Sequence, residues 1–129
     1  MAPPLVLVVD EDFLVRLHTS GMFEDAGFQV IEAWDVASAL EELHEKSNIQ
    51  LVCTDVDMPG ELDGIDLAMH VRNHHPNMKV IVISGFSKDR ALPHSIPFLA
   101  KPFLSARLLD LAHEQLGVLH ERRPIVPEA

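Results

Sequence analysis

The stretch that decides the fold of this chain is Leu51-Val52-Cys53-Thr54-Asp55-Val56-Asp57-Met58-Pro59-Gly60. Its apolar first half predicts a short buried strand, and the Pro-Gly pair predicts the turn that ends it. A strand that ends at Asp55 places this carboxylate at the carboxyl edge of a sheet. In open α/β sheets, ligands bind in the crevice at that edge.

Two further apolar runs end in polar residues in the same way. Residues 5–9 run into Asp10-Glu11-Asp12, and residues 80–83 run into Ser84-Gly85. If the three strands are parallel neighbours, their ends bring several carboxylates and one hydroxyl to a single crevice. Such a cluster of like charges is unfavourable unless a cation neutralises it. The sequence therefore predicts a divalent-metal site centred on Asp55.

Strands and helices alternate along the rest of the chain. Apolar runs predict strands over residues 5–9, 28–31, 49–54, 80–83 and 96–100. Helical periodicity predicts a helix from Phe13 toward Gly27, one capped by Asp35, one from Asp63 or Gly64 to about Pro76, and a last one from Leu104 to Leu116. This alternation predicts a parallel sheet that is covered by helices and joined by right-handed crossovers.

Two of these helices carry apolar stripes. Phe13, Leu14, Leu17, Met22 and Phe23 approximate the stripe of the first helix, and we expect Leu104, Leu108, Leu111 and Leu116 on or near the inner side of the last. The connection between the fourth and fifth strands has only residues 86–95, which Pro93 interrupts. A crossover that includes a helix needs about 10–12 residues or more, so we expect no regular helix there.

Length and composition indicate a single globular domain over residues 1–129, with a core over 5–117 and a loose tail over 118–129. A net charge of −10 without a Lys/Arg cluster argues against direct binding to nucleic acid or to an anionic membrane. Cys53 is the only cysteine, which excludes an internal disulfide and fits a reducing compartment. We therefore expect a cytoplasmic protein.

Four motifs follow predicted strands in order along the chain. They are Asp10-Glu11, Asp55-x-x-Met58-Pro59, Ser84-Gly85 and Lys101-Pro102. Together they resemble the receiver domain of two-component response regulators, and the resemblance covers about residues 5–117. It implies a flavodoxin-like (CheY-like) α/β fold: a five-stranded parallel sheet of order 2-1-3-4-5, helices on both faces, and a fourth helix that is short or irregular. Since no second domain follows Ala129, we expect a stand-alone receiver.

The resemblance also implies the chemistry. Asp55 would accept a phosphoryl group from a histidine kinase, Lys101 would pair with the phosphoryl oxygens, and the Ser84 hydroxyl would hydrogen-bond one of them. Mg²⁺ would be held by Glu11, by Asp55 and by the backbone carbonyl of Asp57, with Asp10 acting through a bound water.

Further positions match the receiver pattern or depart from it. Phe98 matches the aromatic switch position, which would act with Ser84, and the residues expected to line the site are Asp57, Gly85 and Phe86. Glu11 stands where receivers usually have Asp, and Ser84 stands where Thr is commoner. The protein would therefore be a phosphorylation-dependent switch rather than an enzyme, catalysing only its own phosphorylation and dephosphorylation. Its partners would be a sensor histidine kinase or phosphotransfer protein and an unknown output protein.

Three other interpretations compete with this one. Asp55-Val-Asp57 and Asp10-Glu-Asp12 both fit the Asp-x-Asp core of haloacid-dehalogenase-like phosphohydrolases, although no paired acids follow Lys101 and no cap would fit. A pseudo-receiver that binds a partner without phosphorylation is the second, and Glu11 keeps it open. The third is a zinc site on His70, His74 and His75, for which the pattern favours solvated side chains.

Overall fold

The computed structural model describes residues 3–85, 92–93 and 95–117. Within these residues the elements are β1 (Leu5–Val9), α1 (Phe13–Asp25), β2 (Gln29–Ala33), α2 (Val36–Glu45), β3 (Ile49–Asp55), α3 (Gly64–His74), β4 (Lys79–Ser84), β5 (Phe98–Ala100) and α4 (Ser105–Leu116). Strands and helices alternate as predicted, and most of the connection between β4 and β5 lies outside the described residues. None of the described helices combines the length and the apolarity that crossing a bilayer requires.

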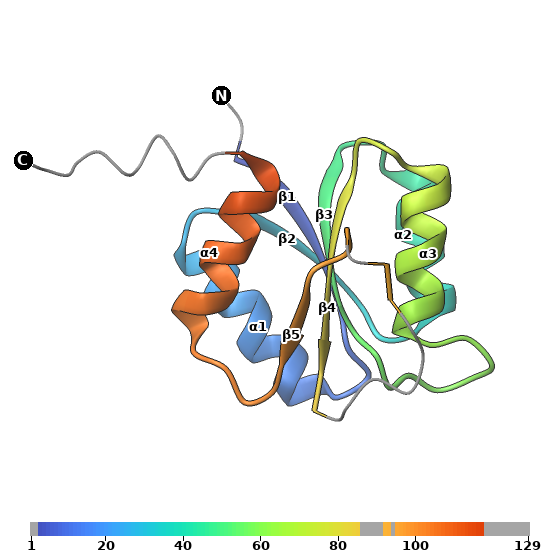
Figure 1. Ribbon diagram of the computed structural model, residues 1–129, viewed down its shortest axis with the longest axis horizontal. Coiled ribbons are helices and arrows are strands. Elements are labelled where there is room, and N and C mark those ends of the chain that lie inside the picture. The colour runs from blue at the N-terminus through green and yellow to red at the C-terminus, as the bar shows by residue number, and fades with distance from the viewer. Residues whose placement is uncertain (1–2, 86–91, 94, 118–129) are drawn as a thin grey trace, which may run out of the picture.

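The five strands form one parallel sheet of order β2-β1-β3-β4-β5, which confirms the predicted topology (Figure 1). Val9 pairs with Thr54, Asp55 with Ile83, and Ser84 with Ala100. The strands therefore end almost level with one another, and the residues that follow them meet at one edge of the sheet.

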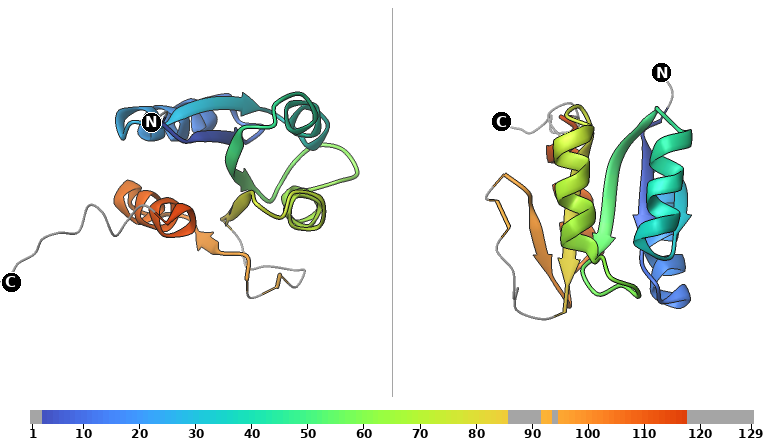
Figure 2. Two further views of the ribbon diagram at one scale, coloured as in Figure 1. Left: turned by 90° about the horizontal axis from the view of Figure 1, so that it is seen from above. Right: turned by 90° about the vertical axis from the view of Figure 1, so that its right-hand side faces the viewer.

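The helices cover both faces of this sheet. Figure 2 shows α1 and α4 on one side and α2 and α3 on the other. Phe23 and Leu108 are fully buried under the first pair, and Leu67 and Val71 are fully buried under the second. The central strands β1 and β3 are buried on both faces, as their continuous apolar runs predict.

Carboxylates start three of the helices at the carboxyl edge. Asp12 accepts hydrogen bonds from the Leu14 and Val15 amides, and Asp35 caps α2 as predicted by accepting from the Ser38 amide. Asp63 caps α3, which begins at Gly64. Each cap satisfies helix N–H groups that have no partner within the helix.

Several element boundaries differ from the predicted ones. β5 is shorter than predicted because the Ile96 amide turns back to the Pro93 carbonyl and Pro97 has no N–H to give a neighbouring strand. β2 begins one residue later, and β4 begins one residue earlier. The connection in which the sequence predicts a short or irregular helix includes residues 86–91 and 94, which lie outside the described residues, as does the predicted tail over 118–129.

The apolar stripes of α1 and α4 are only partly core. Phe13, Leu14 and Leu17 are 59%, 71% and 50% exposed, and Leu104 is 78% exposed because it lies at the N-cap of α4 rather than on its inner side. The buried residues of α1 are Thr19, Ser20 and Phe23. Two small side chains and Phe23 thus pack on the sheet, while the apolar side chains at the start of the helix face solvent.

Candidate acidic site at the carboxyl edge

The centre of the site is Asp55, the last residue of β3. Its Oδ1 lies 3.3 Å from Nζ of Lys101, which directly follows β5. The same ammonium group lies 4.0 Å from Oδ2 of Asp10, which directly follows β1. The parallel register thus brings three charged side chains from separate strands into one cluster, as the sequence predicts.

Backbone hydrogen bonds hold these strand ends in place. The Asp10 amide donates to the Ala33 carbonyl, and the Asp12 amide donates to Asp10 Oδ1 at 2.9 Å. The Lys101 amide donates to the Ser84 carbonyl at 2.8 Å, so Ser84, the buried last residue of β4, is held next to Lys101. Gly85 lies beside the same lysine, since a Cβ there would be 3.9 Å from Lys101 Cδ.

The other expected site residues are more exposed or lie outside the described residues. Glu11 and Asp57 are exposed, and Phe98 is half-buried at the start of β5, packed on the side of α2 and α3. Phe86 lies outside the described residues. Among the described residues, no three His, Cys, Asp or Glu side chains are close enough together to hold a metal ion by themselves.

The donor set nevertheless fits Mg²⁺. This ion takes oxygen ligands, keeps several waters, and is usually bound through one or two carboxylates rather than by a cage of protein ligands. Asp10 and Asp55 supply two largely buried carboxylates that lie on either side of the Lys101 ammonium group. The three histidines form no such site: the His70 and His74 rings stack with their centroids 4.4 Å apart on the exposed end of α3.

Burial raises the pKa of both Asp10 and Asp55 above the usual 3.8, and Lys101 offsets only part of that rise. Like-charge repulsion from Asp10 and Asp57 raises the pKa of Asp55 further, and repulsion from Asp12 raises that of Asp10. Beneath them, burial raises the pKa of the Cys53 thiol to about 12, so this cysteine is a neutral packed side chain. The ionised carboxylates of the site are therefore unfavourable by themselves, and a bound cation would stabilise them.

We expect the metal-free domain to become more stable when Asp10 is replaced by Asn. Because the pKa of Asp10 is higher in the folded chain than in the unfolded one, its ionised form disfavours folding at neutral pH. This unfavourable contribution disappears as the pH falls through the raised pKa toward 3.8. In EDTA, Asp10→Asn should thus raise the melting temperature at about pH 7, and the gain should shrink toward about pH 4.

The matched control is Asp57→Asn, which removes one negative charge at an exposed position near the site. It should change the melting temperature less than Asp10→Asn does. A melting temperature that falls in Asp10→Asn at neutral pH, or a difference from wild type that is the same at both pH values, would contradict the electrostatic argument.

Two residues that contact the site were not predicted from the sequence. The Arg16 side chain, 12% exposed, donates from Nη1 to the Asp10 carbonyl at 2.9 Å and from Nε to Glu32 Oε1 at 2.8 Å. Gly64 begins α3 so close to Asp55 that a Cβ there would lie 1.9 Å from the Asp55 carbonyl oxygen. The sequence features that could have identified them are a basic residue inside the first helix and a glycine at the start of a helix. Both features are common, and neither indicates a role without the fold.

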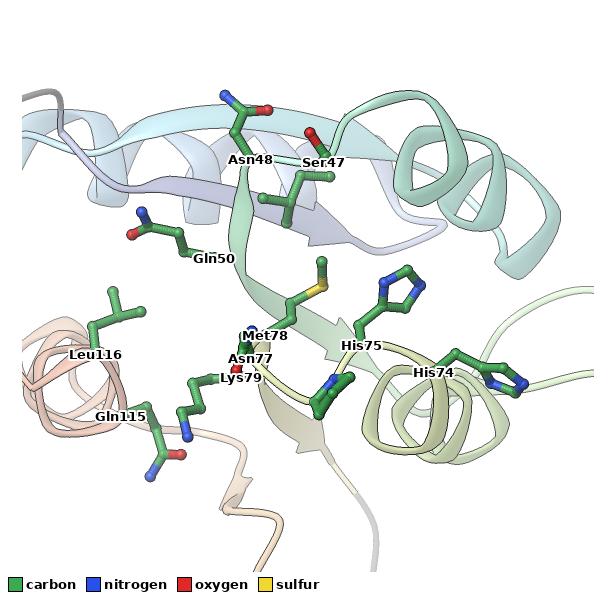
Figure 3. A pocket seen from close by; sticks show the side chains of 12 residues that line it. Ser47, Asn48, Gln50, His74, His75, Asn77, Met78, Lys79, Gln115 and Leu116 are labelled. Carbon is green, nitrogen blue, oxygen red and sulfur yellow. The ribbon is translucent and has the colours of Figure 1, made fainter.

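A hollow also lies at the opposite edge of the sheet. It has a volume of about 700 Å³ and is lined by residues that include Ser47, Asn48, Gln50, His75, Asn77 and Gln115 (Figure 3). Its lining among the described residues contains no carboxylate. It therefore lacks the carboxylates that a phosphoaspartate and its Mg²⁺ need, and these are gathered at the carboxyl edge.

Comparison with known proteins agrees with this geometry. Residues 6–113 match the response regulator receiver domain family. The response regulator receiver protein CpdR of Brucella abortus is 34% identical over 114 residues, which cover 84% of this chain and 91% of CpdR. The sensor kinase CckA of the same organism is 34% identical over 118 residues, which cover 86% of this chain but only 12% of CckA.

Solved structures give the same result. A response regulator receiver protein from Sinorhizobium medicae superimposes with a TM-score of 0.81 at 31% identity, covering 89% of this chain and 95% of that one. The CheX–CheY complex of Borrelia burgdorferi, solved with BeF3 and Mg²⁺, contains a chain that matches with a TM-score of 0.77 at 26% identity, covering 88% of this chain and 90% of that one.

Proposed function

Because the chain belongs to the response regulator receiver domain family, whose members are phosphoacceptor signalling switches, we propose that Asp55 is its phosphoacceptor. The observation that carries this assignment is the cluster of Asp55, Lys101 and Asp10 at the ends of three parallel strands. Nothing in the comparisons favours the phosphohydrolase interpretation. The pseudo-receiver interpretation is disfavoured because acceptor, lysine and hydroxyl residue are all present.

The transfer proceeds by attack of an Asp55 carboxylate oxygen on the phosphorus of a phosphohistidine. The new O–P bond forms as the P–N bond breaks, and the histidine nitrogen keeps the electron pair and is later protonated by solvent. Negative charge is spread over the transferring oxygens, so positioning and electrostatics do most of the catalysis. Lys101, 3.3 Å from Asp55, is placed to pair with one of these oxygens, and Ser84 lies next to it.

Mg²⁺ is the cofactor of this proposal. The carboxylates of Asp55 and Glu11 and the backbone carbonyl of Asp57 would hold it, with Asp10 acting through a water. When bound, the ion supplies positive charge that offsets the repulsion among the acids and the incoming phosphoryl group. Glu11 is exposed, and its side chain is one methylene longer than that of the usual Asp. Whether this side chain reaches the ion therefore depends on the backbone conformation at Glu11.

The signal would leave the site through Ser84 and Phe98. Phosphorylation adds about −1.5 to −2 charge at Asp55, and Ser84 and Lys101 are the nearest residues able to respond. They flank the segment between β4 and β5, and Phe98 in β5 is the register partner of Val82 in β4. The expected change over residues 86–95 concerns a segment that lies largely outside the described residues.

The phosphodonor partner would dock on the exposed apolar side chains beside the site. Phe13 and Leu14 directly follow the acidic loop, and Leu104 lies three residues beyond Lys101. A protein that delivers a phosphoryl group to Asp55 must touch the rim of the crevice, which these residues form. A groove of about 530 Å³ between α1 and α4, lined by Leu17 and Leu109 among others, continues this surface and suits an amphipathic helix.

A transfer experiment tests the function and its docking surface together. With a phosphorylated sensor kinase found by screening those of the same cell, wild type should acquire the phosphoryl group at Asp55. Leu14 is 71% exposed in the free domain and is available for apolar contact with the kinase. Leu14→Gln removes this contact and should slow the transfer about tenfold. Labelling by a small phosphodonor, which needs no docking, should be unchanged.

Leu62→Gln is the matched control, since Leu62 is an exposed leucine in the loop before α3, away from α1 and α4. Slowing by Leu62→Gln but not by Leu14→Gln would place the docking surface elsewhere. A wild-type chain that no phosphorylated kinase and no small donor can label would argue for the pseudo-receiver.

A further inference from the structure

We propose that Arg16 is a positioning residue for metal binding, acting through the peptide unit that joins Asp10 to Glu11. This inference rests on the proposed Mg²⁺ site. Arg16 Nη1 donates to the Asp10 carbonyl oxygen at 2.9 Å, and that oxygen belongs to the peptide between the two acidic residues. Fixing the plane of this peptide fixes the direction in which the chain enters Glu11.

The guanidinium group is itself held firmly. Its Nε donates to Glu32 Oε1 at 2.8 Å, and Glu32 lies on β2, the strand that pairs with β1. Its Cζ lies 5.5 Å from the centroid of the Phe13 ring. The side chain is only 12% exposed, so solvent screens these interactions less than it screens those of a surface pair.

The acidic loop has few other constraints that could replace this one. The Asp10 amide is tied to β2 through the Ala33 carbonyl, and the Asp12 carboxylate is tied to α1 as its cap. The Asp12 amide also donates to Asp10 Oδ1 across Glu11, but that bond lies within the loop and does not connect it to β2. Between these two anchors lies Glu11, whose side chain is exposed. Arg16 links the intervening peptide to β2, and it does so with a planar group whose several N–H donors point in fixed directions.

A longer carboxylate makes this support more important. Glu has one more rotatable bond than Asp, so it loses more side-chain freedom when it binds a metal ion. Groups that orient metal ligands without touching the ion typically change metal affinity by about 10–100-fold when they are removed. We therefore place Arg16 among the residues that determine the Mg²⁺ affinity of this receiver, although it does not touch the ion.

The test measures Mg²⁺ affinity by calorimetry and by the rise in melting temperature on titration with Mg²⁺. Arg16→Gln should weaken Mg²⁺ binding about tenfold or more. Arg16→Lys keeps the charge but not the pair of directed N–H donors, so it should also lose affinity. Phosphorylation by a small donor should be slow in both variants at low Mg²⁺ and should approach the wild-type rate at saturating Mg²⁺.

Two further variants calibrate the result. Lys46→Gln removes the same charge from a surface pair with Glu42 on α2 and should leave Mg²⁺ affinity unchanged. Glu11→Gln removes a proposed ligand and should weaken binding at least as much as Arg16→Gln. If Arg16→Gln and Arg16→Lys both fold and bind Mg²⁺ with wild-type affinity, the positioning role is wrong. If Mg²⁺ binding is weakened in Arg16→Gln alone, the charge of residue 16 matters rather than the geometry of its N–H donors, and the proposal is also overturned.

The Mg²⁺ site and the role of Arg16 can be refuted separately. A wild-type domain that binds no Mg²⁺ would overturn the proposed metal site itself, whatever the Arg16 variants do. Wild-type binding that Glu11→Gln weakens, together with normal binding in both Arg16 variants, would leave the metal site standing and remove only the role of Arg16.

Discussion

Replacing Asp55 with Asn is expected to reduce labelling by a small phosphodonor in Mg²⁺ to below detection, with the fold intact. The amide oxygen is a far weaker nucleophile than the carboxylate, and no other described carboxylate lies as close to Lys101 as the 3.3 Å of Asp55. The fold should survive because burial already disfavours the ionised form of Asp55, whose pKa is raised. Intact-mass spectrometry measures the labelling, and circular dichroism measures the fold.

The control for this experiment is Asp57→Asn, which removes an exposed carboxylate two residues away. That variant should still be labelled, at no more than one phosphoryl group per chain. Phosphorylation of the Asp55→Asn variant at Asp57 or Asp10 would show that the acceptor is misassigned. Repeated turnover of a generic phosphomonoester by wild type would instead point to a phosphohydrolase.

The sheet and the position of Asp55 at its carboxyl edge were predictable because they depend on strong local patterns. Continuous apolar runs identify strands buried on both faces, and a polar residue at the end of each run locates the active edge. Asp10, Asp55 and Lys101 meet as predicted because the parallel register leaves their strand ends level. Asp35 and Asp63 were predictable for a similar reason, since a cap acts within a few residues of itself.

The misplaced residues depend on information that local patterns lack. Leu14, Leu17 and Leu104 have the side chains of core residues but are exposed, and in the proposed function they form the surface on which the phosphodonor docks. An apolar stripe alone does not distinguish a helix face that packs on the sheet from one that is exposed and free to bind another protein. The inner face of α1 uses Thr19 and Ser20, which hydrophobic periodicity does not detect.

Arg16 and Gly64 show a second limit of local patterns. Arg16 contacts Glu32, which is 16 residues away in the sequence, and nothing in the first helix marks that partner. Gly64 is required by a close approach to Asp55 that arises only when the loop after β3 folds back. Both residues support the acidic site from outside it, and only the three-dimensional arrangement identifies them.

Replacing Gly64 with Ala is expected to destabilise the domain severely. The added Cβ would lie 1.9 Å from the Asp55 carbonyl oxygen, 2.7 Å from its carbonyl carbon and 2.9 Å from Val56 Cα. These are backbone atoms of a central strand, so no side chain can turn aside to make room. The Gly64 amide also donates to the Val56 carbonyl at 2.9 Å, and a displaced α3 would lose that bond.

We expect the loss of unfolding free energy to be about 3 kcal/mol or more, which is the upper range for overpacked sites. The melting temperature should then fall by about 10 °C or more. Thermal denaturation followed by circular dichroism measures this change. At temperatures where the variant is still folded, the displaced Asp55 backbone should also slow phosphorylation by a small donor.

Gly21→Ala is the matched control, because it makes the same substitution inside α1 where a Cβ would meet nothing within 4 Å. Alanine lowers the backbone entropy of the unfolded chain and suits a helix better than glycine does, so this variant should gain about 0.4–1 kcal/mol. The two substitutions are chemically identical and differ in what surrounds the new methyl group. A Gly64→Ala domain that melts within a degree or two of wild type would mean that α3 can move away from Asp55 at little cost in free energy. The contact with Gly64 would then not be what holds the end of β3 in place.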